Sequence, residues 1–140
     1  MIRTDRVAAW EDARYDVPVD PILRSAAEWL GERSEGSRIF IPVHNDLVDR
    51  FELESGRPSK AFIDANDTRT LLKFFAEPDT LSEEGVEWIA WFGELHEQEV
   101  EAILAASGAR LCYSVSTKEL GLTRLQIFAV GRGCAREDRS

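Results

Sequence analysis

The sequence has few lysines, no surplus of positive charge and no long hydrophobic run. Only three of its 17 basic residues are lysines, and 26 acidic residues leave a net charge of -9 at pH 7. Nonspecific binding to nucleic acids and to anionic membrane surfaces both require a basic face, so this charge argues against both. No apolar run approaches the roughly 20 residues of a transmembrane helix, and residues 1–10 contain no apolar stretch of the kind found in signal peptides. We therefore predict a cytoplasmic protein with no direct nucleic-acid or membrane partner.

Cysteine is also scarce. Cys112 and Cys134 are the only two cysteines, too few for a disulfide framework. Because no export signal is visible, we expect both to be free thiols in a reducing compartment. Neither lies near a histidine in the sequence, so a Cys–His nucleophile pair has no local support.

The motifs that usually announce an enzyme are missing from the sequence. It contains no phosphate-binding G-x-x-x-x-G-K-[ST] loop, no G-x-G-x-x-G after a strand, no H-E-x-x-H, no G-x-S-x-G and no C-x-x-C. We therefore predict no cofactor, and the sequence favours a protein that is not an enzyme.

Alternation of helical and strand-like patterns is the main positive signal. With 44% hydrophobic and 31% charged residues, the chain has a globular composition, and we expect one domain over 1–130 followed by a polar, disordered tail over 131–140. The expected order begins with helices over 4–13 and from Pro21, and the expected strands are 38–43, 60–64, 85–93, 109–116 and 123–130. This order predicts an α/β domain with a mixed, mainly parallel sheet, helices on its faces and a C-terminal antiparallel hairpin. Range 85–93 is ambiguous, and a helix there would make the protein an α+β domain with a smaller sheet.

The charge is unevenly distributed along the chain. Range 74–109 contains nine acidic residues and no lysine or arginine. It also contains tryptophans, which are enriched at the centres of interfaces. The predicted partner-binding residues are Glu87, Trp88, Trp91, Glu94, Glu97 and Glu101. They favour a small acidic binding or regulatory module that engages a basic face of a protein partner, although a solvated acidic helix beside a core strand would give the same pattern.

A second set of candidates follows the expected parallel strands. In open α/β sheets, ligands bind beyond the carboxyl ends of the strands. His44 and Asp46 follow the first strand, Asp64 and Asp67 follow the second, and Glu94 and His96 follow the third. If these ends converge, carboxylates could hold Mg²⁺ or Mn²⁺ and a histidine could act as acid or base, which defines an alternative function as a small metal- or ligand-dependent enzyme using His44, Asp46, Asp64 and Asp67. Helix capping alone would also place Asn and Asp at these positions.

A third hypothesis is a structural homo-oligomer. Its subunit contact would be formed by Trp88, by Trp91, or by Thr123–Val130 acting as an edge strand.

Overall fold

A computed structural model describes residues 21–43, 46–64, 68–92, 97–117, 122–131 and 134. The predicted helix over 4–13 and most of the predicted tail over 131–140 lie outside these residues. The helices are α2 (Pro21–Arg33), α3 (Asp46–Glu54), α4 (Thr68–Ala76), α5 (Thr80–Glu83) and α6 (Glu97–Ser107), and a 3-10 turn, η1, spans Ser59–Ala61. The strands are β1 (Arg38–Ile41), β2 (Phe62–Asp64), β3 (Val86–Phe92), β4 (Arg110–Thr117) and β5 (Leu122–Ala129).

The strands form one five-stranded sheet in the order β2-β1-β3-β5-β4. β1 pairs in parallel with both β2 and β3, whereas β5 pairs in antiparallel with both β3 and β4. The structure thus confirms the predicted α/β domain with a C-terminal antiparallel hairpin. It also resolves the ambiguity at 85–93, because β3 is a strand and lies at the centre of the sheet.

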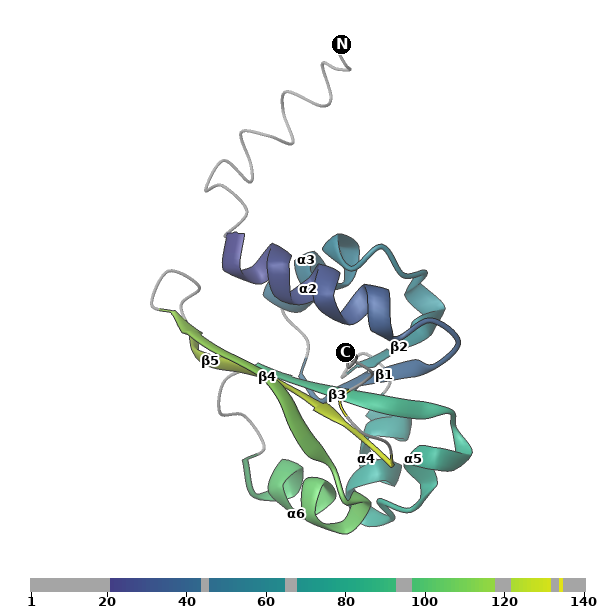
Figure 1. Cartoon of the computed structure of the whole chain (residues 1–140). Coiled ribbons are helices and arrows are strands. Elements are labelled where there is room, and N and C mark those ends of the chain that lie inside the picture. Colours follow the sequence, from purple (N-terminus) through teal and green to yellow (C-terminus); the bar gives the residue numbers. More distant parts are fainter. Residues whose placement is uncertain are drawn as a thin grey trace.

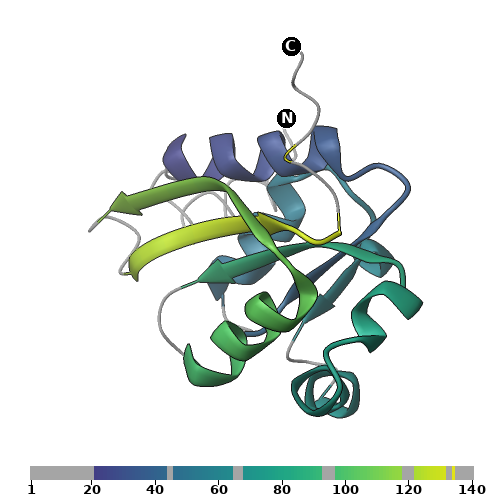
Figure 2. The same cartoon turned by 60° about the horizontal axis from the view of Figure 1, so that its bottom comes forward.

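Helices cover both faces of this sheet (Figure 1). α2 and α3 lie on one face, and α4, α5 and α6 lie on the other, so the molecule has three layers. The rotated view shows the sheet between α2 and the α4–α6 side (Figure 2). Each face has its own buried cluster, one centred on Trp88 and Ile41 and the other on Trp91 and Phe40.

Aromatic pairs join the layers. The rings of Phe40 and Phe74 meet edge to face with centroids 4.9 Å apart, which joins β1 to α4. The rings of Phe51 and Phe92 meet in the same way at 5.0 Å and join α3 to β3. Each such pair contributes about 1 kcal/mol beyond the area it buries, so these contacts help to fix the helices on the sheet.

The hairpin corrects the prediction about the sheet edge. β5 is hydrogen-bonded on both sides, and β4 is the outer strand. The hypothesis that Thr123–Val130 forms a subunit contact as an edge strand is therefore wrong, because its backbone groups are already engaged by β3 and β4.

The cysteines are a second correction, since Cys112 and Cys134 form a disulfide rather than two free thiols. The hairpin supplies the physical reason. Arg110 pairs with Ala129, so the chain leaving β5 starts beside the first residues of β4. The Cα atoms of the two cysteines lie 5.3 Å apart, within the usual range for a bridge.

One glycine is required where α2 meets the end of α3. A Cβ atom built on Gly31 would overlap the carbonyl oxygen of Ser55, which is backbone and cannot swing away. The side chains of Arg24 and Glu54 form an ion pair at 3.2 Å between the same two helices. The close approach of α2 and α3 therefore depends on the absence of a side chain at position 31.

We predict that Gly31→Ala lowers the free energy of unfolding by about 2 kcal/mol, although alanine is the better helix former by roughly 1 kcal/mol. Urea denaturation measures the change. Ser25→Ala, at an exposed position of the same helix, is the control and should change the free energy by less than about 0.5 kcal/mol. A Gly31→Ala protein as stable as the native one would show that the helices are not this close.

Candidate functional site

The carboxyl ends of three parallel strands lie at one edge of the sheet. Ile41, the last residue of β1, is in register with Asp64, the last residue of β2, and β3 runs parallel to β1 on its other side. The prediction that the carboxyl ends of these three strands lie together is therefore confirmed for the backbone of the strands. Four of the predicted residues, His44, Asp67, Glu94 and His96, lie outside the described residues, whereas Asp46 and Asp64 lie within them.

Asp64 lies close to carboxylates that come from α3. Asp46 is exposed at the first position of this helix, and Asp49 is also exposed, whereas Glu52 is half-buried. Glu52 shares a hydrogen bond with Asp64 and experiences the charges of Asp64 and Asp49. The end of β2 and one face of α3 thus form an acidic cluster of Asp49, Glu52 and Asp64.

Burial is the largest cause of the raised pKa of Glu52. Together with the hydrogen bond to Asp64 and the charges of Asp64 and Asp49, it raises the pKa of Glu52 from 4.5 to about 8. At neutral pH the Glu52 carboxyl group therefore keeps its proton and donates a hydrogen bond to the Asp64 carboxylate. Protonation removes the repulsion that two adjacent carboxylates would otherwise have.

In the part of the chain that the structure describes, no three Asp, Glu, His or Cys side chains converge in a way that could bind a metal ion. The Mg²⁺ or Mn²⁺ site of the enzyme hypothesis would therefore need His44 or Asp67, which lie outside this part.

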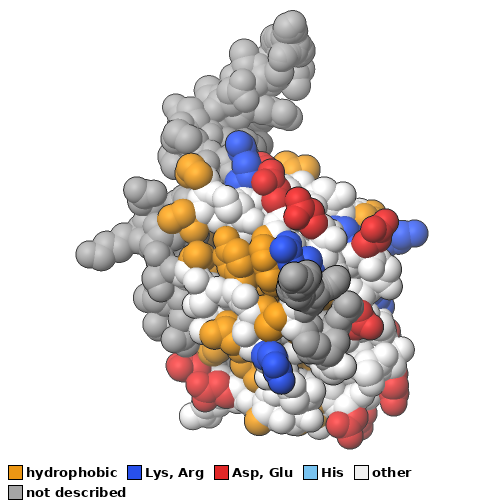
Figure 3. All heavy atoms as spheres, in the orientation of Figure 1, with side chains coloured by type: hydrophobic (Ala, Val, Ile, Leu, Met, Phe, Trp, Pro, Cys, Tyr) orange, Lys and Arg blue, Asp and Glu red, His pale blue; other side chains and the backbone are white. Residues whose placement is uncertain are grey.

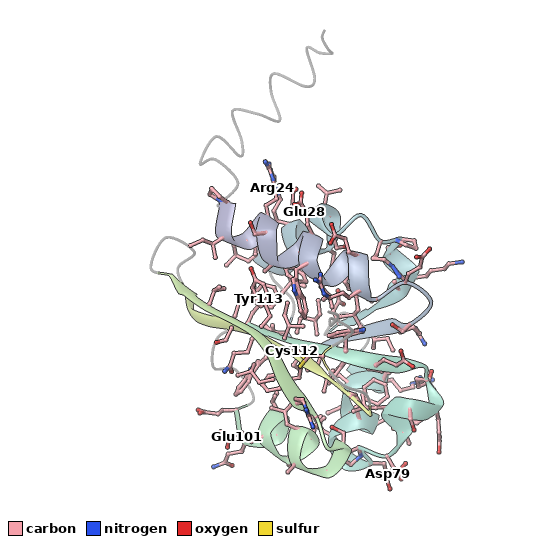
Figure 4. All side chains as sticks on the ribbon, viewed as in Figure 1. Arg24, Glu28, Asp79, Glu101, Cys112 and Tyr113 are labelled. Carbon is pink, nitrogen blue, oxygen red and sulfur yellow. A yellow bond between two sulfur atoms is a disulfide. The ribbon has the colours of Figure 1, made fainter. Side chains whose placement is uncertain are left out.

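The acidic range 74–109 includes α5, the central strand β3 and α6, and its exposed acidic residues lie on the α4–α6 side of the sheet. Glu84 is neutralised, because its two carboxylate oxygens lie 3.4 Å from Arg38 and 3.4 Å from Lys73. Figure 4 shows Asp79 near α5 and Glu101 on α6, both pointing outward, and Figure 3 shows acidic side chains along the same lower margin of the molecule. Within range 74–109, the exposed acidic residues that form no ion pair with another described residue are Glu77, Asp79, Glu83, Glu99 and Glu101. We call these five residues the acidic surface.

The structure corrects the prediction for the two tryptophans of this range. Trp88 is 0% exposed and Trp91 is 3% exposed, because β3 is covered on both faces. Neither side chain can form a partner or subunit contact in this conformation. Of the other predicted contact residues, Glu97 and Glu101 are exposed on α6, Glu87 is half-buried on β3, and Glu94 is outside the described residues.

A hollow of about 450 Å³ opens within the acidic range. It lies between α5, the first residues of β3 and the end of α6. Its lining includes the carboxylates Asp79 and Glu87 and the hydroxyls Ser82 and Ser107. Its size is within the range of small-molecule sites, and it is large enough for a side chain of a partner.

Sequence reasoning missed Asp49 and Glu52 at the carboxyl edge. Asp46, Asp49 and Glu52 recur every three residues, a spacing that places helical side chains on neighbouring positions of one face. Because α3 is the next element after β1 in the chain, the spacing could have indicated that α3 turns carboxylates toward the strand ends.

Comparison of the chain with protein-family models, curated proteins and solved structures finds no match. None of the helices in the described ranges has the length and hydrophobicity that crossing a bilayer requires. The function must therefore be argued from the chemistry of this chain alone.

We predict that Glu52 makes the protein less stable as the pH rises. A folded-state pKa near 8 lies above the value of 4.5 for the free side chain. The contribution of the raised Glu52 pKa to the free energy of unfolding is therefore complete below pH 4.5 and is lost as the pH rises through 8. Glu52→Gln keeps a hydrogen-bond donor but cannot ionise. The free energy of unfolding of this variant should therefore fall less between pH 4.5 and pH 8 than that of the native protein.

Urea denaturation at a series of pH values compares the native protein with Glu52→Gln and with Glu28→Gln, an exposed control. All three proteins retain both histidines, so histidine titration cancels in the comparison. Identical pH profiles for the native and Glu52→Gln proteins would contradict the assignment.

Proposed function

We propose that this protein is a binding module that engages a basic segment of a protein partner through its acidic surface. The observation that carries the proposal is that Glu77, Asp79, Glu83, Glu99 and Glu101 are exposed and form no ion pair within the described residues. Exposed like charges keep a protein soluble, and they also attract a partner of opposite charge. A partner with Lys or Arg side chains would pair with them on contact.

The hollow between α5 and α6 supports the same proposal. Asp79 belongs to the acidic surface and also lines the hollow. The half-buried Glu87, which is not part of the acidic surface, lines the hollow as well. A Lys or Arg side chain that enters such a hollow would be partly desolvated, where an ion pair is stronger than on an open surface. The charge steers the partner, and the hollow supplies a place for an anchoring side chain.

The location of the protein remains a proposal too. The sequence predicts the cytoplasm. The Cys112–Cys134 disulfide weighs toward an oxidising compartment, where such bridges persist. The binding proposal holds in either compartment, because it depends on surface charge.

The test is a triple charge reversal, Glu83→Lys, Glu99→Lys and Glu101→Lys, measured with a fluorescent peptide that alternates lysine and arginine. We expect the association rate to fall at least about tenfold, and we expect binding to the native protein to weaken as salt is added. The control reverses Glu28, Glu32 and Glu35, which are exposed on the other side of the sheet and give the same change in net charge. If both triple variants bind equally weakly, only net charge matters and the acidic surface is not the site.

The carboxyl-edge cluster favours a second candidate, a small metal- or ligand-dependent enzyme. The specific observation is the half-buried Glu52 beside Asp64, with its pKa raised to about 8, because strongly shifted pKa values are concentrated at functional sites. In this candidate Glu52 would act as a general acid, and Asp64 would hold its proton in place or bind a divalent cation together with His44 or Asp67.

For this second candidate we predict that Mg²⁺ or Mn²⁺ raises the melting temperature and that EDTA reverses the rise. A ligand at 100 times its Kd adds roughly 2.7 kcal/mol of stability, which a thermal-shift assay detects. Asp64→Asn should abolish the shift, and Asp79→Asn, a matched change on the acidic surface, should leave it intact. A shift that survives in Asp64→Asn would place the cation elsewhere, and no shift in the native protein would remove the metal from this candidate.

A further inference from the structure

A second hollow lies at the amino ends of β1 and β2, opposite the acidic cluster of Asp49, Glu52 and Asp64. Its volume is about 440 Å³, and it is lined by three basic residues, Arg38, Arg57 and Lys60, together with Ser37, Pro58 and Ala61. None of the described residues that line it is acidic. In a chain of net charge -9, three bases around one hollow oppose the charge of the molecule as a whole.

Arg57 is the central residue of this hollow. Its Nη1 donates to the carbonyl oxygen of Ser34 at 2.8 Å, and its Nη2 donates to that of Ser37 at 3.1 Å. These two hydrogen bonds hold the loop after α2 against the loop after α3. The guanidinium group is therefore fixed in position before any ligand arrives, which lowers the entropy cost of binding.

Hydrogen-bonding groups remain in excess around Arg57. A guanidinium has five N–H donors, and its Nε is buried with no acceptor among the described residues. Buried polar groups of this kind are rare in folded proteins, and a donor that belongs to a charged group is the costliest to leave unpaired.

The other two bases differ in how far they are neutralised. Arg38 donates to the backbone oxygen of Glu84 at 3.3 Å and lies 3.4 Å from its carboxylate, so part of its charge is compensated. Lys60 is exposed and has no ion pair within the described residues. Two full positive charges, on Arg57 and Lys60, therefore remain at the hollow.

We propose that this hollow binds a small organic phosphate monoester. A phosphate monoester carries between one and two negative charges at pH 7 and presents three acceptor oxygens, which matches Arg57 and Lys60 in charge and in hydrogen bonding. Pro58 and Ala61 provide an apolar wall for the organic part. This site is separate from the acidic surface, so it would give the binding module a small-molecule ligand in addition to its partner.

The test is a titration of the isotope-labelled full chain with phenyl phosphate, followed by NMR of the backbone amides. Saturable shifts are expected at residues 36–38 and 57–61. Lys60→Gln should raise the Kd by about tenfold, because a charge-assisted hydrogen bond is lost. Arg69→Gln removes one exposed positive charge on α4, at the other end of β2, and should leave the Kd within about twofold.

Two further probes distinguish the chemistry of the ligand. Phenol, which has the same ring without charge, should not bind, and benzoate, which carries one negative charge, should bind more weakly than phenyl phosphate. The proposal is overturned if phenyl phosphate causes no saturable shift at millimolar concentration, if Lys60→Gln binds as tightly as the native protein, or if Arg69→Gln weakens binding equally. Phenol or benzoate binding as tightly as phenyl phosphate would overturn it as well.

Discussion

The pairing of β3 on both sides is the constraint on which the rest of the structure depends. β3 joins the parallel half of the sheet, β1 and β2, to the antiparallel half, β5 and β4. Its side chains alternate between the two cores, with Trp88 in one and Trp91 in the other. A strand buried on both faces must be almost wholly apolar, and β3 is apolar apart from the half-buried Glu87.

Acidic and basic side chains gather on different parts of the molecule around β3. The tryptophans of β3 are used in the core, and the five residues of the acidic surface lie on α5, on α6 and in the turn before α5. The bases are placed elsewhere, and three of them surround the hollow at the amino ends of β1 and β2. The molecule therefore presents surfaces of opposite charge, and the two proposed ligands, a basic protein segment and a phosphate monoester, follow from this separation.

The sequence was sufficient to predict the α/β class and the C-terminal hairpin, because these depend on local periodicity, but it left 85–93 ambiguous between a strand and a helix. It was insufficient wherever the outcome depends on packing between distant elements. The burial of Trp88 and Trp91 requires both layers of helices, and the assignment of β4 as the outer strand requires the order of the sheet. The disulfide depends on how the chain leaves β5, which local patterns do not encode.

The candidate site likewise has one part that the sequence could predict and another that depends on packing between distant elements. Convergence of the strand ends at Asp64 was predictable, since parallel strands share a carboxyl edge. Glu52 was missed, because its raised pKa results from burial by α3 against the sheet and from contact with a residue 12 positions away. The basic hollow was missed for a similar reason. The segments that line it, 36–38 and 57–61, contain no recognisable motif, and Arg57 joins residues 34–37 to the end of α3 only in the folded chain.

The most direct test of the central claim is to map where a basic peptide touches the protein. Backbone amide shifts of the labelled full chain would be recorded during titration with the lysine–arginine peptide at low salt. If the acidic surface is the binding face, the changes will concentrate in residues 77–87 and 97–107. Changes spread equally over the acidic residues of α2 and α3 would contradict the account, because they would show attraction to net charge without a defined site.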